Sequence, residues 1–202
     1  VAAQMSRGKS EKTVAFAMSS VAATLAKFSM DVCLYMSQNF DFISLPAHLT
    51  TGSSIMPHKK NPDVFELIRG KCNKIQALPY EITLITNNLP SGYHREFQLL
   101  KEGLFPAIQN LKACLDIAIF SIKDIKVKDN ILADPKYNSL FTVDTLNQML
   151  LAGMPFRDAY KAVAEQLENG TYESPKATQH THEGSINNLC LKEIKEKMQN
   201  AF

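Results

Sequence analysis

Residues 11–39 read EKTVAFAMSSVAATLAKFSMDVCLYMSQN, and this stretch decides the fold class. Its large apolar residues alternate spacings of four and three: Val14, Met18, Val21, Leu25, Phe28, Val32 and Tyr35. That alternation is the heptad pattern of a helix that packs against other helices, and a strand cannot produce it. Alanines on the other faces are small enough to let further helices approach closely. We therefore predict a long helix inside a bundle.

Two further long helices are predicted downstream. One begins at Asn61-Pro62, where asparagine can cap the helix and proline can occupy its first position. Pro79 predicts a kink or break in it, and Pro106 a bend in the next helix, which runs from about Arg95 to Ile122. Their apolar stripes are Val64, Leu67, Ile68, Cys72, Ile75 and Leu78 in the first, and Leu104, Ile108, Leu111, Leu115, Ala118 and Ile122 in the second.

The character of the sequence changes near Ile125, where segments shorten and Asp, Asn, Gly and Pro become frequent. We predict short helices over about 143–151, 155–167 and 189–198, with a polar, irregular segment over 169–188. The expected fold is all-α: residues 1–125 form part of a long-helix bundle, and residues 126–202 form a small helical C-terminal domain.

Composition excludes several classes of function. The 202 residues carry 22 basic and 20 acidic side chains, and this balance offers no electrostatic footprint for nucleic acid or an anionic membrane. No apolar stretch is expected to span a bilayer. The four cysteines lie far apart, as in a cytoplasmic protein with reduced thiols. The opening Val-Ala-Ala, without an initiator Met, predicts that the chain is part of something longer.

One loop concentrates the chemistry. Residues 51–63, TGSSIMPHKKNPD, lie between the first two predicted long helices. Gly52 gives the backbone freedom to expose the hydroxyls of Ser53 and Ser54. Lys59 and Lys60 add positive charge beside the start of a helix, whose free N–H groups also favour an anion. Such a loop suits a carboxylate substrate and the charge that develops during a reaction. A solvated, flexible linker would use the same residue types.

The order of residues in this loop, Gly-Ser-Ser-x-Met-Pro-x-Lys-x-Asn-Pro, resembles the signature of the fumarase/aspartase superfamily, whose members release fumarate. Within it, KKNPD at 59–63 followed by ELIR at 66–69 is similar to the argininosuccinate lyases. The segments LPSGYHREFQLLKE at 89–102 and GMPFRDA at 153–159 resemble the same family's C-terminal half. The likeness thus covers essentially the whole chain. His58 departs from it, because the family more often has Gln there.

The resemblance implies a role for each matching residue. Ser53 matches the general base that removes a proton from the carbon beside the substrate carboxylate. Lys59 and Asn61 match groups that bind that carboxylate and stabilise the added charge, and Glu66 matches a glutamate that pairs with an active-site histidine. The remaining matches are substrate-contacting positions: Ser54, Tyr93, Gln98 and Lys101. Gln98 and Lys101, three residues apart on one helix, would face one cleft.

The resemblance further implies a cytoplasmic homotetramer with no metal or organic cofactor, which cleaves argininosuccinate to arginine and fumarate. Each of its sites is built from three segments, and the N-terminal domain has no counterpart here, so the chain alone is expected to be inactive. Two alternatives stay open: another fumarate-releasing lyase, such as adenylosuccinate lyase, and a non-catalytic structural relative. His180 and His182 predict a polar loop and not a metal site, because no third ligand has suitable spacing.

Overall fold

The computed structural model describes residues 1–175 and 180–201. It is all-α apart from one two-stranded pairing, which confirms the predicted fold class. The chain divides into two compact units, residues 1–128 and 129–202.

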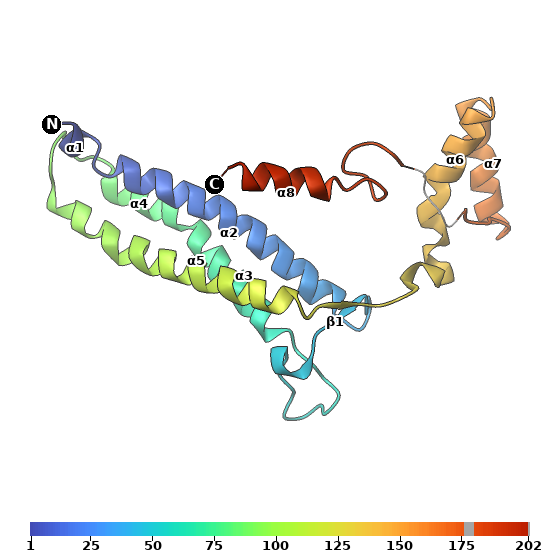
Figure 1. The fold of residues 1–202 in the computed structure, drawn as a ribbon, viewed down its shortest axis with the longest axis horizontal. Coiled ribbons are helices and arrows are strands. Elements are labelled where there is room, and N and C mark those ends of the chain that lie inside the picture. The colour runs from blue at the N-terminus through green and yellow to red at the C-terminus, as the bar shows by residue number, and fades with distance from the viewer. Residues whose placement is uncertain (176–179, 202) are drawn as a thin grey trace. The chain divides into compact units, whose positions relative to one another are not determined.

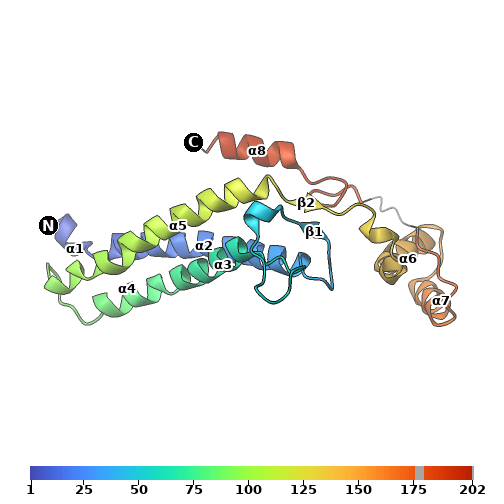
Figure 2. The ribbon, with the colours of Figure 1, turned by 90° about the horizontal axis from the view of Figure 1, so that it is seen from below.

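The first unit is an elongated bundle of three rods (Figures 1 and 2). The first rod is α2 (Lys9–Tyr35), preceded by the short α1 (Ala2–Met5). The second is α3 (Asp63–Gln76) continued by α4 (Leu78–Thr86), and the third is α5 (Leu100–Ile122). The predicted break at Pro79 is confirmed, because α4 begins anew at Leu78 with the proline in its first turn.

The predicted core seam of α2 is only half right. Val14 and Val21 are 45% and 44% exposed, whereas Ala15 and Ala22 are fully buried. The buried positions form a neighbouring heptad seam: Ala15, Met18, Ala22, Leu25, Ser29 and Val32. Both seams share Met18, Leu25 and Val32. The second rod packs on the seam with the smaller residues, because short side chains let the two backbones approach closely.

Similar shifts affect the other two rods. Leu67 and Ile122, predicted in the core, are exposed, while Phe65 and Leu100 are buried. Exposed large apolar residues therefore remain on all three rods, among them Val14, Phe16, Val21, Leu67, Tyr80, Leu84, Phe105, Ile119 and Phe120. By length and composition alone, α2 and residues 95–122 are long and apolar enough to cross a membrane. Core helices pass the same test, and both lie in this bundle.

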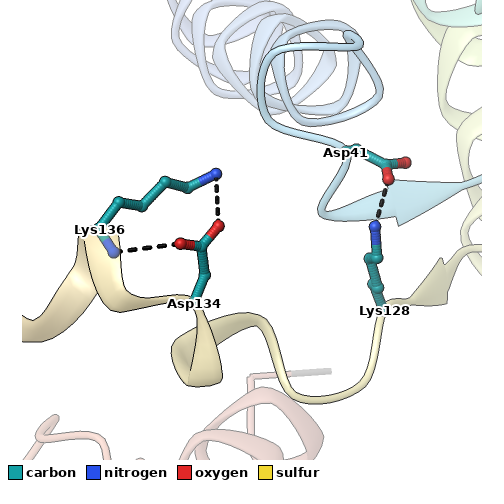
Figure 3. Close-up of polar contacts among 4 residues, drawn as sticks. All are labelled: Asp41, Lys128, Asp134 and Lys136. Atoms are coloured by element: carbon teal, nitrogen blue, oxygen red, sulfur yellow. Dashed lines mark hydrogen bonds and ion pairs between the residues drawn. The ribbon is translucent and has the colours of Figure 1, made fainter.

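The two ends of the bundle differ. At one, called the loop end, β1 (Ile43–Ser44) pairs antiparallel with β2 (Lys126–Val127), which follows α5. Lys128 there forms an ion pair with Asp41 (Figure 3). A 3-10 turn η1 (Ala47–Leu49) then leads into the loop at 51–61, and His48 lies 3.5 Å from Asp124. At the other, called the Tyr93 end, α1, the end of α4 and the start of α5 meet (Figure 1).

The second unit is a smaller helical assembly. After the 3-10 segments η3 (Ile131–Ala133) and η4 (Pro135–Phe141), α6 (Thr142–Leu151) packs against α7 (Phe156–Glu168). Asp134 caps η4 by accepting the N–H of Lys136 at 3.1 Å and pairing with its ammonium at 3.0 Å (Figure 3). The last helix, α8 (Leu191–Gln199), has no buried residue. Of the segment predicted to be irregular, the described residues contain no helix, and 176–179 lie outside the described residues.

Gly8, directly before α2, should be intolerant of a side chain. Its φ is +80°, and an added Cβ would lie 2.7 Å from Cγ2 of Thr86 and 3.1 Å from Cε1 of Phe97. We predict that Gly8→Ala lowers the free energy of unfolding by about 1–3 kcal/mol, because the backbone is strained and the new methyl group clashes. Denaturant titration followed by circular dichroism measures this.

Gly70→Ala is the matched control. Gly70 lies inside α3 with nothing within 4 Å of an added Cβ, so alanine there should raise stability by about 0.5–1 kcal/mol. A Gly8→Ala protein as stable as the parent would contradict the close packing of the first turn of α2 against α4 and the 3-10 turn η2 (Arg95–Gln98).

The cysteines should differ in reactivity. Cys72 on α3 and Cys114 on α5 are buried, and burial with the neighbouring Cys114 raises the pKa of Cys72 to about 12. Because the thiolate is the reactive form, a maleimide at pH 8 should modify the half-exposed Cys190 first and Cys33 more slowly, since burial raises the pKa of Cys33, and should leave the buried pair until the protein unfolds. Mass spectrometry of the labelled peptides measures this. Labelling of Cys72 as fast as Cys190 in the native state would contradict the bundle core.

Candidate functional site: the 51–61 loop and the Tyr93 cluster

The loop at 51–61 is closed at its neck by its own backbone. The Thr51 N–H donates to the Asn61 carbonyl at 3.1 Å, and the Asn61 N–H donates to the Thr51 carbonyl at 2.8 Å. The Thr51 hydroxyl also donates to the carboxylate of Asp63, in the first turn of α3. The loop therefore leaves and rejoins the bundle at one point, and its side chains are held close to the start of α3.

Within this loop, Ser53 differs from its neighbours. It is half-buried, whereas Ser54 is exposed. The Ser53 hydroxyl oxygen accepts the backbone N–H groups of Ile55 at 3.2 Å and Met56 at 3.1 Å. Two amide donors on one oxygen favour negative charge there, as in an oxyanion hole. This is the feature that a serine acting as a base would need.

The positive groups of the loop are free to meet a ligand. Lys59 and Lys60 are exposed, and in the described part of the chain neither forms an ion pair. The Asn61 side-chain amide lies 3.5 Å from the Gly52 carbonyl, so it stays at the neck of the loop. Lys59 and Asn61 thus lie on the same short loop as Ser53.

The start of α3 is a weaker anion site than expected. Its first turn carries the carboxylates of Asp63 and Glu66. Their negative charge offsets the positive end of the helix dipole, which weakens its attraction for an anionic ligand. Glu66 is exposed. The pKa of the Cys33 thiol on α2 is raised, mainly by burial; the charge of Arg69 lowers this pKa and that of Glu66 raises it. No histidine of the described residues forms an ion pair with Glu66.

Tyr93, Gln98 and Lys101 lie at the Tyr93 end. The Gln98 side-chain amide donates to the Tyr93 hydroxyl at 2.9 Å, and both residues are exposed. The predicted single helix over 95–122 is wrong in its first turn: the 3-10 turn η2 (Arg95–Gln98) precedes α5, which begins at Leu100. Gln98 and Lys101 therefore do not share one α-helix, although both are exposed at its start.

The structure does not bring these two groups together within one chain. The loop at 51–61 follows β1, and β1 pairs with β2, which comes after the last residue of α5. Gln98 lies just before the first residue of α5, at the opposite end of that helix. The 23 residues of α5 span about 35 Å at about 1.5 Å per residue. Figure 1 shows the same separation between the loop before α3 and the segment that joins α4 to α5.

Sequence reasoning missed one member of the Tyr93 group. The guanidinium carbon of Arg7 lies 5.4 Å from the ring centroid of Tyr93 and 5.7 Å from that of Phe97. Arg7 lies more than 80 residues before Tyr93 in the sequence, and nothing in its local pattern indicates this contact. The predicted residues also do not line the 370 Å³ surface cavity at the start of α8. Among the described residues, no group of three or more His, Cys, Asp or Glu is placed to hold a metal.

Known proteins resemble this chain along its whole length. A protein family described as lyase matches residues 4–77. The argininosuccinate lyase of Parabacteroides distasonis is 56% identical over all 202 residues, and that of Bacteroides thetaiotaomicron is 54% identical over 199. The chain spans 45% of the length of each of these relatives. The class II fumarase of Schistosoma mansoni has a similar fold: it superposes with a TM-score of 0.67 over 80% of this chain and 34% of its own, at 21% identity.

Proposed function

Because this chain belongs to the argininosuccinate lyase branch of the fumarase/aspartase superfamily, we propose that it carries two segments of the active site of a carbon–nitrogen lyase. The whole protein would reversibly split argininosuccinate into arginine and fumarate, in arginine biosynthesis. The observation that carries the proposal is the Ser53 oxygen, held by two backbone amides in the loop that also carries Lys59 and Asn61. The substrate rests on the identity to argininosuccinate lyases over the whole chain.

The proposed reaction starts with the removal of a proton from a carbon atom of the substrate. Ser53 as an alkoxide takes a proton from the carbon beside a substrate carboxylate, and the electron pair left behind spreads into that carboxylate. The amides of Ile55 and Met56 lower the cost of the alkoxide. Lys59 and Asn61 bind the carboxylate, and their attraction grows as charge develops, so they stabilise the transition state more than the ground state.

The second half of the elimination needs a group outside these residues. The electron pair forms the double bond of fumarate, the carbon–nitrogen bond breaks, and the departing guanidino nitrogen takes up a proton. We propose that a histidine from elsewhere in the whole protein, paired with Glu66, belongs to that proton path. Ser54, Tyr93, Gln98 and Lys101 would contact the parts of the substrate that do not react.

Association of several copies would complete the site. The 51–61 loop and the Tyr93 group lie at opposite ends of a bundle about 35 Å long, so one site would take them from different copies. The exposed apolar side chains on all three rods support packing between copies, and we propose a homotetramer in the cytoplasm. Residues 1–125 would be part of its central bundle domain, and residues 126–202 its small C-terminal domain.

Two alternatives would leave different signatures. Another lyase of the superfamily, such as adenylosuccinate lyase, would release fumarate from a different substrate. A structural relative would fold and assemble but release none. An assay of the whole protein with argininosuccinate and adenylosuccinate side by side, with fumarate followed by absorbance, separates all three.

Ser53→Ala should abolish catalysis in the whole protein. We expect kcat to fall by at least about a thousandfold with KM changed little, because the hydroxyl acts on the proton and contributes little to affinity. Ser54→Ala is the matched control, with a far smaller loss in kcat. A Ser53→Ala enzyme within about tenfold of the parent, or about 1.4 kcal/mol of barrier, would mean that another group is the base.

Two impaired variants should restore each other's activity. We expect the whole protein with Ser53→Ala and the one with Lys101→Ala to recover activity when they are coexpressed and assemble together. About a quarter of the sites would then be intact, because each site draws the two segments independently from copies mixed in equal amounts. Activity of the mixture is measured against each variant alone. No recovery in proven mixed assemblies would mean that one copy supplies both segments.

The 202-residue chain by itself should release no fumarate. In the proposed mechanism the proton donor for the leaving nitrogen lies elsewhere in the whole protein, and well-positioned groups supply roughly 7–11 kcal/mol of barrier reduction in such sites. The purified chain is assayed by absorbance with argininosuccinate, beside the whole protein at equal molar concentration. A rate near that of the whole protein would show that the active site has been misplaced.

A further inference from the structure

The Tyr93 end holds a cation that the proposed mechanism does not use. Arg7 lies in the turn between α1 and α2, half-buried, with its guanidinium over the rings of Tyr93 and Phe97. Within the described residues it forms no ion pair, and its Nε is buried without a hydrogen-bond partner. A buried guanidinium nitrogen without a partner is costly, so its position calls for a reason other than stability.

The fold forces Arg7 into this position. Gly8 adopts a left-handed conformation with φ +80°, and its N–H donates to the Glu11 carboxylate at 3.0 Å. The backbone there runs so close to Thr86 and Phe97 that only glycine fits. The turn before α2 is thereby fixed against the end of α4 and against η2, and Arg7, one residue earlier, meets the two rings.

Two successive contacts connect Arg7 to residues that are proposed to bind substrate. Arg7 packs on the ring of Tyr93, and the hydroxyl of the same Tyr93 accepts the side-chain amide of Gln98 at 2.9 Å. A guanidinium is flat and attracted to the face of an aromatic ring, so it restricts how the ring can turn. Tyr93 and Gln98 are otherwise exposed.

We propose that Arg7 is a positioning residue of the active site: its guanidinium holds the ring of Tyr93, and through the Tyr93 hydroxyl the amide of Gln98, in the orientation that binds substrate. This inference rests on the proposed function, in which Tyr93 and Gln98 contact the substrate. Arg7 itself neither touches the reacting atoms nor moves a proton. It acts by keeping two exposed groups arranged before the substrate arrives, which lowers the ordering cost of binding.

Kinetics of the whole protein provide one test. Arg7→Met keeps the length of the side chain but removes the flat cation, and should raise KM for argininosuccinate about tenfold with kcat within about threefold. Lys9→Met, which removes a charge from an exposed position two residues away, should leave both unchanged. Arg7→Lys should recover only part of the loss, because an ammonium attracts the ring but lacks the flat face.

A double-mutant cycle separates positioning from a merely structural role. In a protein with Tyr93→Leu, which has no ring to hold, Arg7→Met should cause no further rise in KM. Equal tenfold effects in both backgrounds would show that Arg7 acts independently of Tyr93 and would overturn the inference. So would a KM within twofold of the parent in the Arg7→Met single variant.

A second measurement does not depend on activity. In the 202-residue chain with ¹³C-labelled tyrosine, six ring signals are expected, and Tyr93→Phe identifies that of Tyr93. Arg7→Met should shift and broaden the Tyr93 signal while Lys9→Met does not. An unmoved Tyr93 signal overturns the inference whatever the enzyme does. If the Tyr93 signal of the 202-residue chain shifts but the whole protein cleaves no argininosuccinate, the contact is supported and the proposed function is refuted instead.

Discussion

The close contact between α2 and the second rod, formed by α3 and α4, is the constraint on which the rest of the molecule depends. Ala15 and Ala22 are fully buried on α2, and such short side chains let the backbones of neighbouring helices approach closely. The 27 residues of α2 span about 40 Å, and both candidate groups are placed relative to this rod. Arg7 and Gly8 lie at its beginning, and the chain that follows its end leads through β1 into the 51–61 loop.

Much of this fold could be predicted from the sequence, because spacing alone identifies helices. The heptad pattern of α2, the proline at the start of α4 and the change of character near Ile125 are local signals. The local sequence does not determine which of the two seams of α2 becomes buried in the core. Met18, Leu25 and Val32 belong to both seams of α2, and only the packing partner decides between alanines on one side and valines on the other. The exposed Val14 and Val21 are the result.

The candidate site was predictable in its parts and not in its arrangement. The signature loop identifies Ser53, Lys59 and Asn61 as candidates, but the two amide hydrogen bonds to the Ser53 oxygen depend on how the backbone turns after Gly52. The 3-10 turn η2 passes into α5 through Leu99, whose backbone is itself right-handed helical, so the apolar spacing used to predict the helix does not separate the two. Contacts between distant segments, such as Arg7 on Tyr93, leave no trace in spacing.

The length of the bundle then limits how a complete site can form. The rod α5 continues through Pro106 as one helix, and three rods packed on a shared core cannot fold back on themselves without losing that core. A single copy therefore cannot close the distance of about 35 Å between the loop end and the Tyr93 end. In the homotetramer proposed above, packing of copies side by side would do so, because exposed apolar residues of α2 and α5 lie along the same rods that separate the two groups. The feature that keeps the groups apart within one chain is thus also the surface that could bring them together between chains.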